Sequence, residues 1–141
     1  MPYAIGLVLS LAVAVFGRRS GFDRDRAFYS TITIVVGAYY VLFAATTGSI
    51  EIVAMEVALM AVFAVAAVVG FKSNLWIVAA ALAGHGLFDM VHGRILDNPG
   101  VPAWWPAFCA TYDVAAGGIM AWMLKNGTLT KAARENIHAG R

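Results

Sequence analysis

The sequence predicts an all-α integral membrane protein, a bundle of about five transmembrane helices with its N-terminus outside and its C-terminus in the cytoplasm. Of the 141 residues, 61% are hydrophobic and only 13% are charged. A soluble domain carries about 25% charged residues, so these polar side chains are too few to cover a water-facing surface. The charges also lie between long apolar stretches. We expect one domain, with the bundle over residues 1–127 and a cytoplasmic tail over 128–141.

The spans follow from these apolar stretches, because a helix needs about 20 apolar residues to cross a bilayer. The first runs from about residue 3 to 17, which is short for this purpose. The others cover 27–47, 51–71, 73–92 and 103–124. Alternation with period two is missing from all of them, so a β-barrel is not expected.

Capping and turn residues indicate where these spans begin and end. Ser73 or Asn74 can cap the fourth span by accepting a hydrogen bond from its free amides. Pro99 and Gly100 suit a tight turn after that span. Pro106 falls in the first turn of the fifth span, where its missing N–H does no harm.

The basic residues predict the orientation. With five spans, nine of the ten basic residues lie on one side of the membrane: Arg18, Arg19, Arg24, Arg26, Lys72, Lys125, Lys131, Arg134 and Arg141. Only Arg94 lies on the other side, so the positive-inside rule places the N-terminus outside. We therefore expect a multi-pass protein of the bacterial inner membrane. Because the basic residues form no single patch, nucleic acid is not expected as a partner.

Ionisable residues inside the spans are the candidates for a functional site, because lipid makes them costly and they are usually functional there. His85, Asp89 and His92 occupy positions i, i+4 and i+7 of the fourth span and share one helix face. Glu56 lies in the third span and Asp113 in the fifth. Counted at about 1.5 Å per residue from the outer ends, all of them fall in the outer half of the membrane.

These side chains suit a divalent Zn, Fe or Mn ion, because imidazoles and carboxylates form a hard-to-borderline ligand set. We predict His85, Asp89 and His92 as ligands of one metal or of a pair. A metal-bound water would attack an ester-like bond in a lipid or another hydrophobic substrate, with Glu56 or Asp113 as the catalytic base. Metal-centred oxidation is the alternative reaction.

Two residues near the outer end are candidates for substrate binding. Arg94 would hold an anionic headgroup or pair with a carboxylate, and Trp105 would anchor the fifth span or cover the site. Cys109 is expected to be a small buried apolar residue rather than a ligand. Close helix packing is expected at two pairs of glycines: Gly84, Gly86, Gly117 and Gly118.

The second half of the chain carries a family resemblance. Its motifs are the run 85–92 (HGLFDMVH), Asn98-Pro99, Trp104-Trp105-Pro106, Cys109 and Asp113. Together they resemble a family of small uncharacterised bacterial polytopic membrane proteins. The resemblance supports a membrane location and implies no reaction.

Two other functions stay open. In an ion or proton transport component, the same polar residues would pass a charge through the bundle, and so small a chain would need to form a homo-oligomer. A through-path also needs polar residues at the inner face, which the inner halves of the last three spans lack. In a structural or accessory subunit, the polar residues would only lock helix packing.

Overall fold

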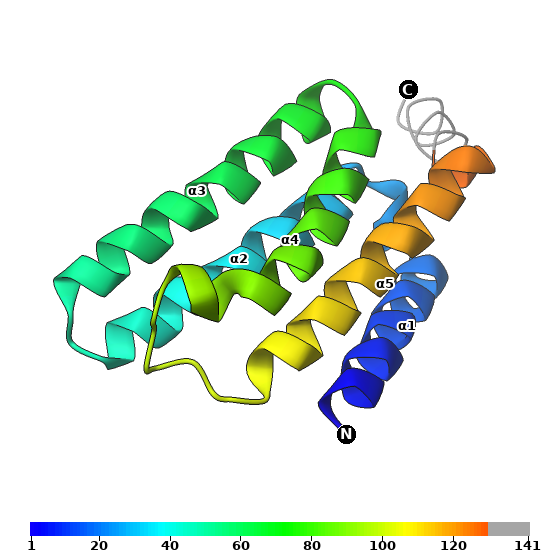
Figure 1. Cartoon of the computed structure of the whole chain (residues 1–141). Helices are drawn as coiled ribbons and strands as arrows, with labels where there is room; N and C mark the ends of the chain where they lie inside the picture. Colours follow the sequence, from blue (N-terminus) through cyan, green and yellow to red (C-terminus); the bar gives the residue numbers. More distant parts are fainter. Residues whose placement is uncertain (130–141) are drawn as a thin grey trace.

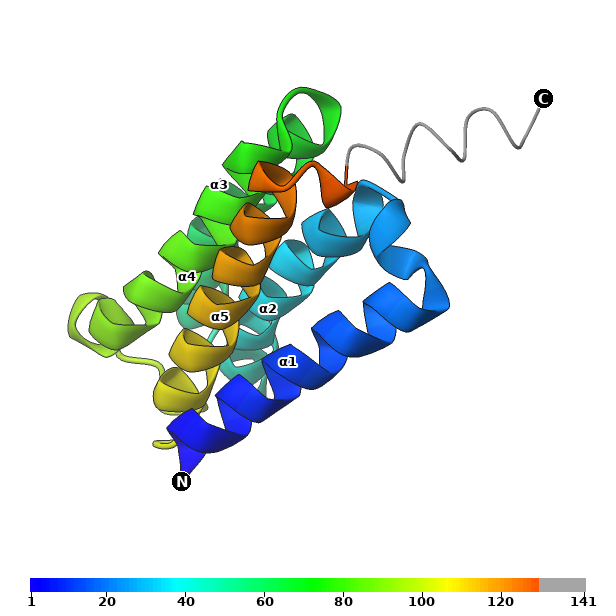
Figure 2. The ribbon, with the colours of Figure 1, turned by 90° about the vertical axis from the view of Figure 1, so that its right-hand side faces the viewer.

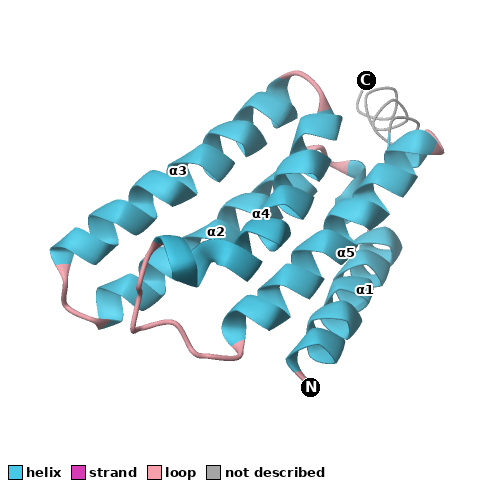
Figure 3. Cartoon of the chain, in the orientation of Figure 1, coloured by secondary structure: helices cyan, strands magenta, loops and turns pink. Residues whose placement is uncertain are grey.

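The computed structural model describes residues 1–129, so all but the first two positions of the predicted tail lie outside the described residues. Five α-helices follow one another along the chain (Figure 1): α1 (Pro2–Ser20), α2 (Ala27–Thr46), α3 (Ile50–Lys72), α4 (Leu75–Ile95) and α5 (Trp105–Lys125). A short 3₁₀-helix, η1 (Phe22–Arg24), lies between α1 and α2. Loops and turns connect these elements (Figure 3).

All five helices are long and apolar enough to cross a membrane. This confirms the all-α class and the number of helices, and it suggests a multi-pass membrane protein. The predicted bounds differ most at two C-terminal ends. The first helix continues past residue 17 to Ser20, where Gly21 ends it in the left-handed conformation with φ of 80°. The fourth continues past residue 92 to Ile95.

The helices pack in a fixed order. Helix α5 lies between α4 and α1, and α3 packs against α2 and α4. Helix α1 therefore packs along α5 rather than along α2. In the second view, α1 and α2 diverge from each other (Figure 2). We call the end of the bundle with Met1 and the α4–α5 connection the N-terminal end (Figure 1). The opposite end, with the arginines of the α1–α2 connection, is the arginine end.

Glycines allow α4 and α5 to approach closely. A Cβ at Gly86 would lie 2.7 Å from the carbonyl oxygen of Ala110 on α5. A Cβ at Gly117 would meet the backbone of α4 at a similar distance, 2.8 Å. The predicted packing role is therefore confirmed for these two glycines. For Gly84 and Gly118 the prediction is wrong, because a Cβ there would face open space.

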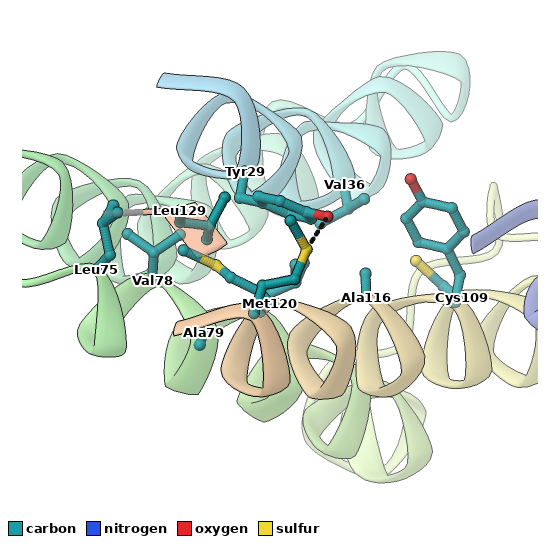
Figure 4. Close-up of a cluster of buried hydrophobic side chains, with 12 residues drawn as sticks. Tyr29, Val36, Leu75, Val78, Ala79, Cys109, Ala116, Met120 and Leu129 are labelled. Atoms are coloured by element: carbon teal, nitrogen blue, oxygen red, sulfur yellow. Dashed lines mark hydrogen bonds between the residues drawn. The ribbon is translucent and has the colours of Figure 1, made fainter. Parts of the chain in front are cut away.

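An apolar cluster fills the interior toward the arginine end (Figure 4). It includes Leu75 and Val78 from α4 and Met120 from α5. The hydroxyl of Tyr29 donates to the sulfur of Met123 across this cluster, at 3.7 Å. Cys109 also belongs to this cluster, which thus extends to the buried histidine and aspartates of α4 and α5.

The capping of α4 resolves one alternative left open by the sequence. The side-chain oxygen of Asn74 accepts from the backbone N–H of Trp76 at 3.0 Å, so Asn74 is the cap. Ser73 instead donates its hydroxyl to the carbonyl of Val69, at 2.6 Å. Pro106 lies in the first turn of α5, as expected.

Candidate metal centre

Four buried side chains from two adjacent helices form the strongest candidate for a metal site. His85 and Asp89 come from α4, and Cys109 and Asp113 come from α5. Each offers one ligand atom, and these atoms all lie within 4.8 Å of one another. We call these residues the α4–α5 group. Because none of them is more than 2% exposed, the group is shielded from the surroundings of the protein.

The shortest contacts in the α4–α5 group converge on one carboxylate. His85 Nδ1 lies 2.7 Å from Asp113 Oδ2 and 3.6 Å from Asp89 Oδ2. The thiol of Cys109 donates to the same Asp113 oxygen, at 3.4 Å. His85, Cys109 and Asp113 are thus connected by hydrogen bonds, whereas Asp89 contacts His85 only at ion-pair distance.

The carboxylate oxygens of this group have few hydrogen-bond donors. Oδ1 of Asp113 is buried without a partner, and Asp89 lies beside the hydroxyl of Tyr40 and the thiol of Cys109 without a well-formed hydrogen bond to either. Among the described residues, neither carboxylate forms an ion pair with a lysine or arginine, and His85 faces both. Because burying two carboxylates beside a single imidazole is costly, a bound cation would stabilise this arrangement.

Helix geometry explains why these residues meet. His85 and Asp89 are four positions apart on α4, and Cys109 and Asp113 are four apart on α5, so each pair occupies one helix face. The close approach at Gly86 brings the two faces together. Counted at about 1.5 Å per residue from Ile95 at the end of α4 and from Trp105 at the start of α5, His85 and Asp113 also lie at similar depths, about 15 and 12 Å.

A second buried polar group lies nearer the N-terminal end and involves three elements. His92 Nε2 on α4 is 3.1 Å from Glu56 Oε2 on α3. Asn98, from the α4–α5 connection, donates to Glu56 Oε1 at 2.7 Å and to the carbonyl of Tyr40 at 3.2 Å. We call Glu56, His92 and Asn98 the α3–α4 group. It fixes the α4–α5 connection against α2 and α3.

Tyr40 connects the two groups. Its ring centre lies 4.2 Å from that of His92 and 6.2 Å from that of His85. Phe63 packs edge-on against His85 at 4.7 Å. The imidazoles are therefore held between aromatic rings as well as by their carboxylate partners.

The structure groups the predicted site residues differently from the sequence analysis. His85 and Asp89 stay together, but His92 pairs with Glu56 instead of joining them. Asp113, predicted as a base, lies among the candidate ligands, and so does Cys109, predicted only as a buried apolar residue. The i, i+4 spacing of these last two residues is the signal in the sequence that could have indicated this arrangement.

The two predicted substrate-binding residues have different surroundings. Trp105 is half-buried, and its ring centre lies 4.9 Å from those of both Tyr39 and Phe43. Arg94 is exposed near the end of α4 and forms no ion pair with a described residue. Only Trp105 contributes to a binding cavity.

That cavity has a volume of about 760 Å³ and lies between α1, α2 and α5. Its lining side chains carry no charge, and they include Trp105, Phe108 and Tyr39. Cys109 belongs both to this lining and to the α4–α5 group. The cavity therefore reaches the candidate metal centre from the side of α1 and α2.

The α3–α4 group gives the first testable prediction. Asn98→Ala would leave one Glu56 oxygen and the Tyr40 carbonyl without their donor, which costs about 1–3 kcal/mol. Asn98→Asp should cost more, because it replaces that donor by a carboxylate beside Glu56. Thermal unfolding in detergent would rank the three proteins. Equal stability of the Ala and Asp variants would contradict the assigned direction of the hydrogen bond.

No protein-family model, curated protein or solved structure matches this chain. The family resemblance seen in the sequence therefore adds no activity.

Proposed function

We propose that this chain is a small membrane metalloprotein in which His85, Asp89 and Asp113 hold one divalent ion. It would hydrolyse an ester-like bond in a lipid or another hydrophobic molecule. The observation that carries the proposal is the group of two buried carboxylates and one imidazole whose ligand atoms lie within 4.8 Å of one another, with few donors for the carboxylate oxygens. Such acceptors in a lipid-embedded bundle are what a divalent cation would satisfy.

Charge balance favours three ligands rather than four. The carboxylates of Asp89 and Asp113 together neutralise a divalent ion when His85 is neutral. A Cys109 thiolate would add a further negative charge, which is costly in a buried site. We therefore assign Cys109 as a neutral thiol beside the metal. This leaves a fourth position open for water or substrate, as in catalytic zinc sites.

The open position would lie next to the cavity, because Cys109 lines it. A metal-bound water there is a nucleophile near neutral pH. Among the buried histidines and acidic residues of α1 to α5, Glu56 and His92 are those that the metal does not use, and their hydrogen-bonded pair would accept the proton. Zinc suits hydrolysis because it needs no redox change, whereas iron or manganese at the same ligands would favour oxidation.

The placement in the membrane follows from the charge bias. With the arginine end in the cytoplasm, the metal centre would lie nearer the periplasmic side of the bacterial inner membrane. All of its proposed ligands come from one chain, so the site needs no second subunit. Lipid is the partner that the proposal requires.

A proton or ion transport role is less well supported. It would use the same imidazole–carboxylate pairs, but the apolar cluster of Val78, Met120 and Met123 fills the interior toward the arginine end. A charge crossing the bundle would have to pass through that cluster. An accessory subunit would retain the packing and would bind no metal.

Hydrolysis of short-chain and long-chain p-nitrophenyl esters by the zinc-loaded protein tests this function. We expect Cys109→Ala to keep both zinc and activity, because the thiol is not a ligand. Asp113→Asn should lose zinc, and its activity should fall to that of the metal-free protein. Hydrolysis that is equal with and without zinc would contradict the proposal. Loss of zinc in Cys109→Ala would instead indicate four protein ligands and a closed, structural site.

A further inference from the structure

We infer that the cavity between α1, α2 and α5 binds one hydrocarbon chain of a membrane lipid, which enters sideways between α1 and α2. The inference names the substrate class of the proposed hydrolytic site and rests on that function for the role of the lipid's polar end. The binding of the hydrocarbon chain is inferred from the shape and lining of the cavity alone.

The dimensions of the cavity suit a single chain. Its volume of about 760 Å³ falls within the range of about 300–1,000 Å³ typical of small-molecule sites. The lining residues span Met1 to Leu9 on α1, Thr31 to Tyr39 on α2 and Trp104 to Tyr112 on α5. Each of these stretches rises about 12 Å. That length approaches the hydrocarbon depth of one leaflet, which is half of about 30 Å.

The side of the cavity is open where lipid would lie. Helix α1 packs along α5 rather than along α2, and the second view shows the two helices diverging (Figure 2). Lining residues on both edges of this opening are exposed, among them Leu9 at 44% and Val35 at 46%. In a membrane-spanning bundle such faces contact acyl chains, so a lipid hydrocarbon chain is available to enter the cavity.

The two ends of the lining differ in chemistry. Aromatic residues, including Trp104 and Trp105, surround the N-terminal end, which is typical of side chains at headgroup level. Deeper in the cavity, the lining includes Cys109, which also belongs to the α4–α5 group. A chain seated in the cavity would hold the ester linkage of its lipid between the aromatic residues and the metal.

Photolabelling tests whether a chain enters. The wild-type protein is placed in vesicles of phosphatidylethanolamine and phosphatidylglycerol that contain phosphatidylethanolamine with a diazirine in one acyl chain. After illumination, labelled peptides are mapped by mass spectrometry. Val36 and Cys109 line the cavity yet are only 7% and 2% exposed, so a chain outside the bundle does not reach them. We expect label on both, in addition to outward residues such as Val62 on α3.

A pair of matched variants isolates the cavity. Leu9→Trp would fill it, whereas Leu7→Trp adds the same bulk to α1 at a residue of similar exposure, 43%, that does not line the cavity. We expect Leu9→Trp to reduce the label at Val36 and Cys109 several-fold and to leave the label at Val62 unchanged. Leu7→Trp should label like the wild type.

The outcomes separate this inference from the proposed function. The inference is overturned if Leu9→Trp does not reduce the label at Val36 and Cys109, or if these residues are never labelled, even when the protein binds zinc. Cavity labelling in a protein that binds no metal would support the inference and reject the metal site.

Discussion

Replacing His85 by alanine should lower the affinity of the protein for zinc at least about 100-fold, because even residues that only orient metal ligands contribute 10–100-fold. His92→Ala should leave the affinity within about threefold of the wild type. Both residues are buried imidazoles on α4, and each is hydrogen-bonded to a carboxylate. They differ in that only His85 belongs to the group whose ligand atoms lie within 4.8 Å.

Competition with a zinc chelator on detergent-purified protein measures this difference. The His92 variant controls for the general effect of removing a buried imidazole, since it strands Glu56 much as the other variant strands Asp113. Equal loss of zinc in both variants would contradict the grouping. It would favour instead the ligand set expected from the sequence, in which His92 takes part.

Gly86→Ala should disrupt the same centre without replacing any of the proposed ligands. The added Cβ would lie 2.7 Å from the Ala110 carbonyl oxygen and 2.9 Å from Asp113 Cβ, so α4 and α5 must separate. Overpacking of this kind costs about 1–3 kcal/mol. Moving Asp113 away from His85 should also weaken zinc binding.

Gly84→Ala is the matched control, because a Cβ there meets nothing within 4 Å. It should be neutral or stabilising by up to about 1 kcal/mol, since alanine favours a helix more than glycine does. Thermal unfolding and zinc affinity, measured side by side, check both variants. If the Gly86→Ala variant matched the Gly84→Ala variant in stability and in zinc affinity, the prediction would be wrong, because the centre would tolerate separation of α4 and α5.

The helices were predictable because lipid imposes a simple requirement. Each span must be long, apolar and flanked by polar segments, and these features can be recognised in the sequence. The ends of α1 and α4 were harder to place, because Arg18, Arg19 and Arg94 continue the helices beyond the apolar stretch. A helix need not end where its hydrophobicity does.

Which residues belong to the site was easier to predict than which of them contact each other. Depth along the spans correctly indicated that His85 and Asp113 lie level with each other, and they meet at 2.7 Å. Depth does not say which helices touch, however, so nothing in the sequence separated His92 from the other candidate ligands. That separation depends on α3 packing against α4, which brings Glu56 to His92.

Asn98 and Tyr40 were not identified as site residues, for two different reasons. Asn98 lies in a connection whose sequence indicates a turn, and its contact with Glu56 requires the connection to fold back over α2 and α3. Tyr40 is one of several aromatic residues in an apolar span. Its position between the two imidazoles depends on the packing of α2, which periodicity alone does not define.

The central claim is that the α4–α5 group binds a divalent metal ion, and elemental analysis of the purified wild-type protein tests it most directly. We expect about one equivalent of zinc, or of iron or manganese, either as purified or after reloading of the chelated protein. A protein that contains no metal and takes up none on reloading would contradict it. The buried carboxylates would then be proton-binding or packing residues.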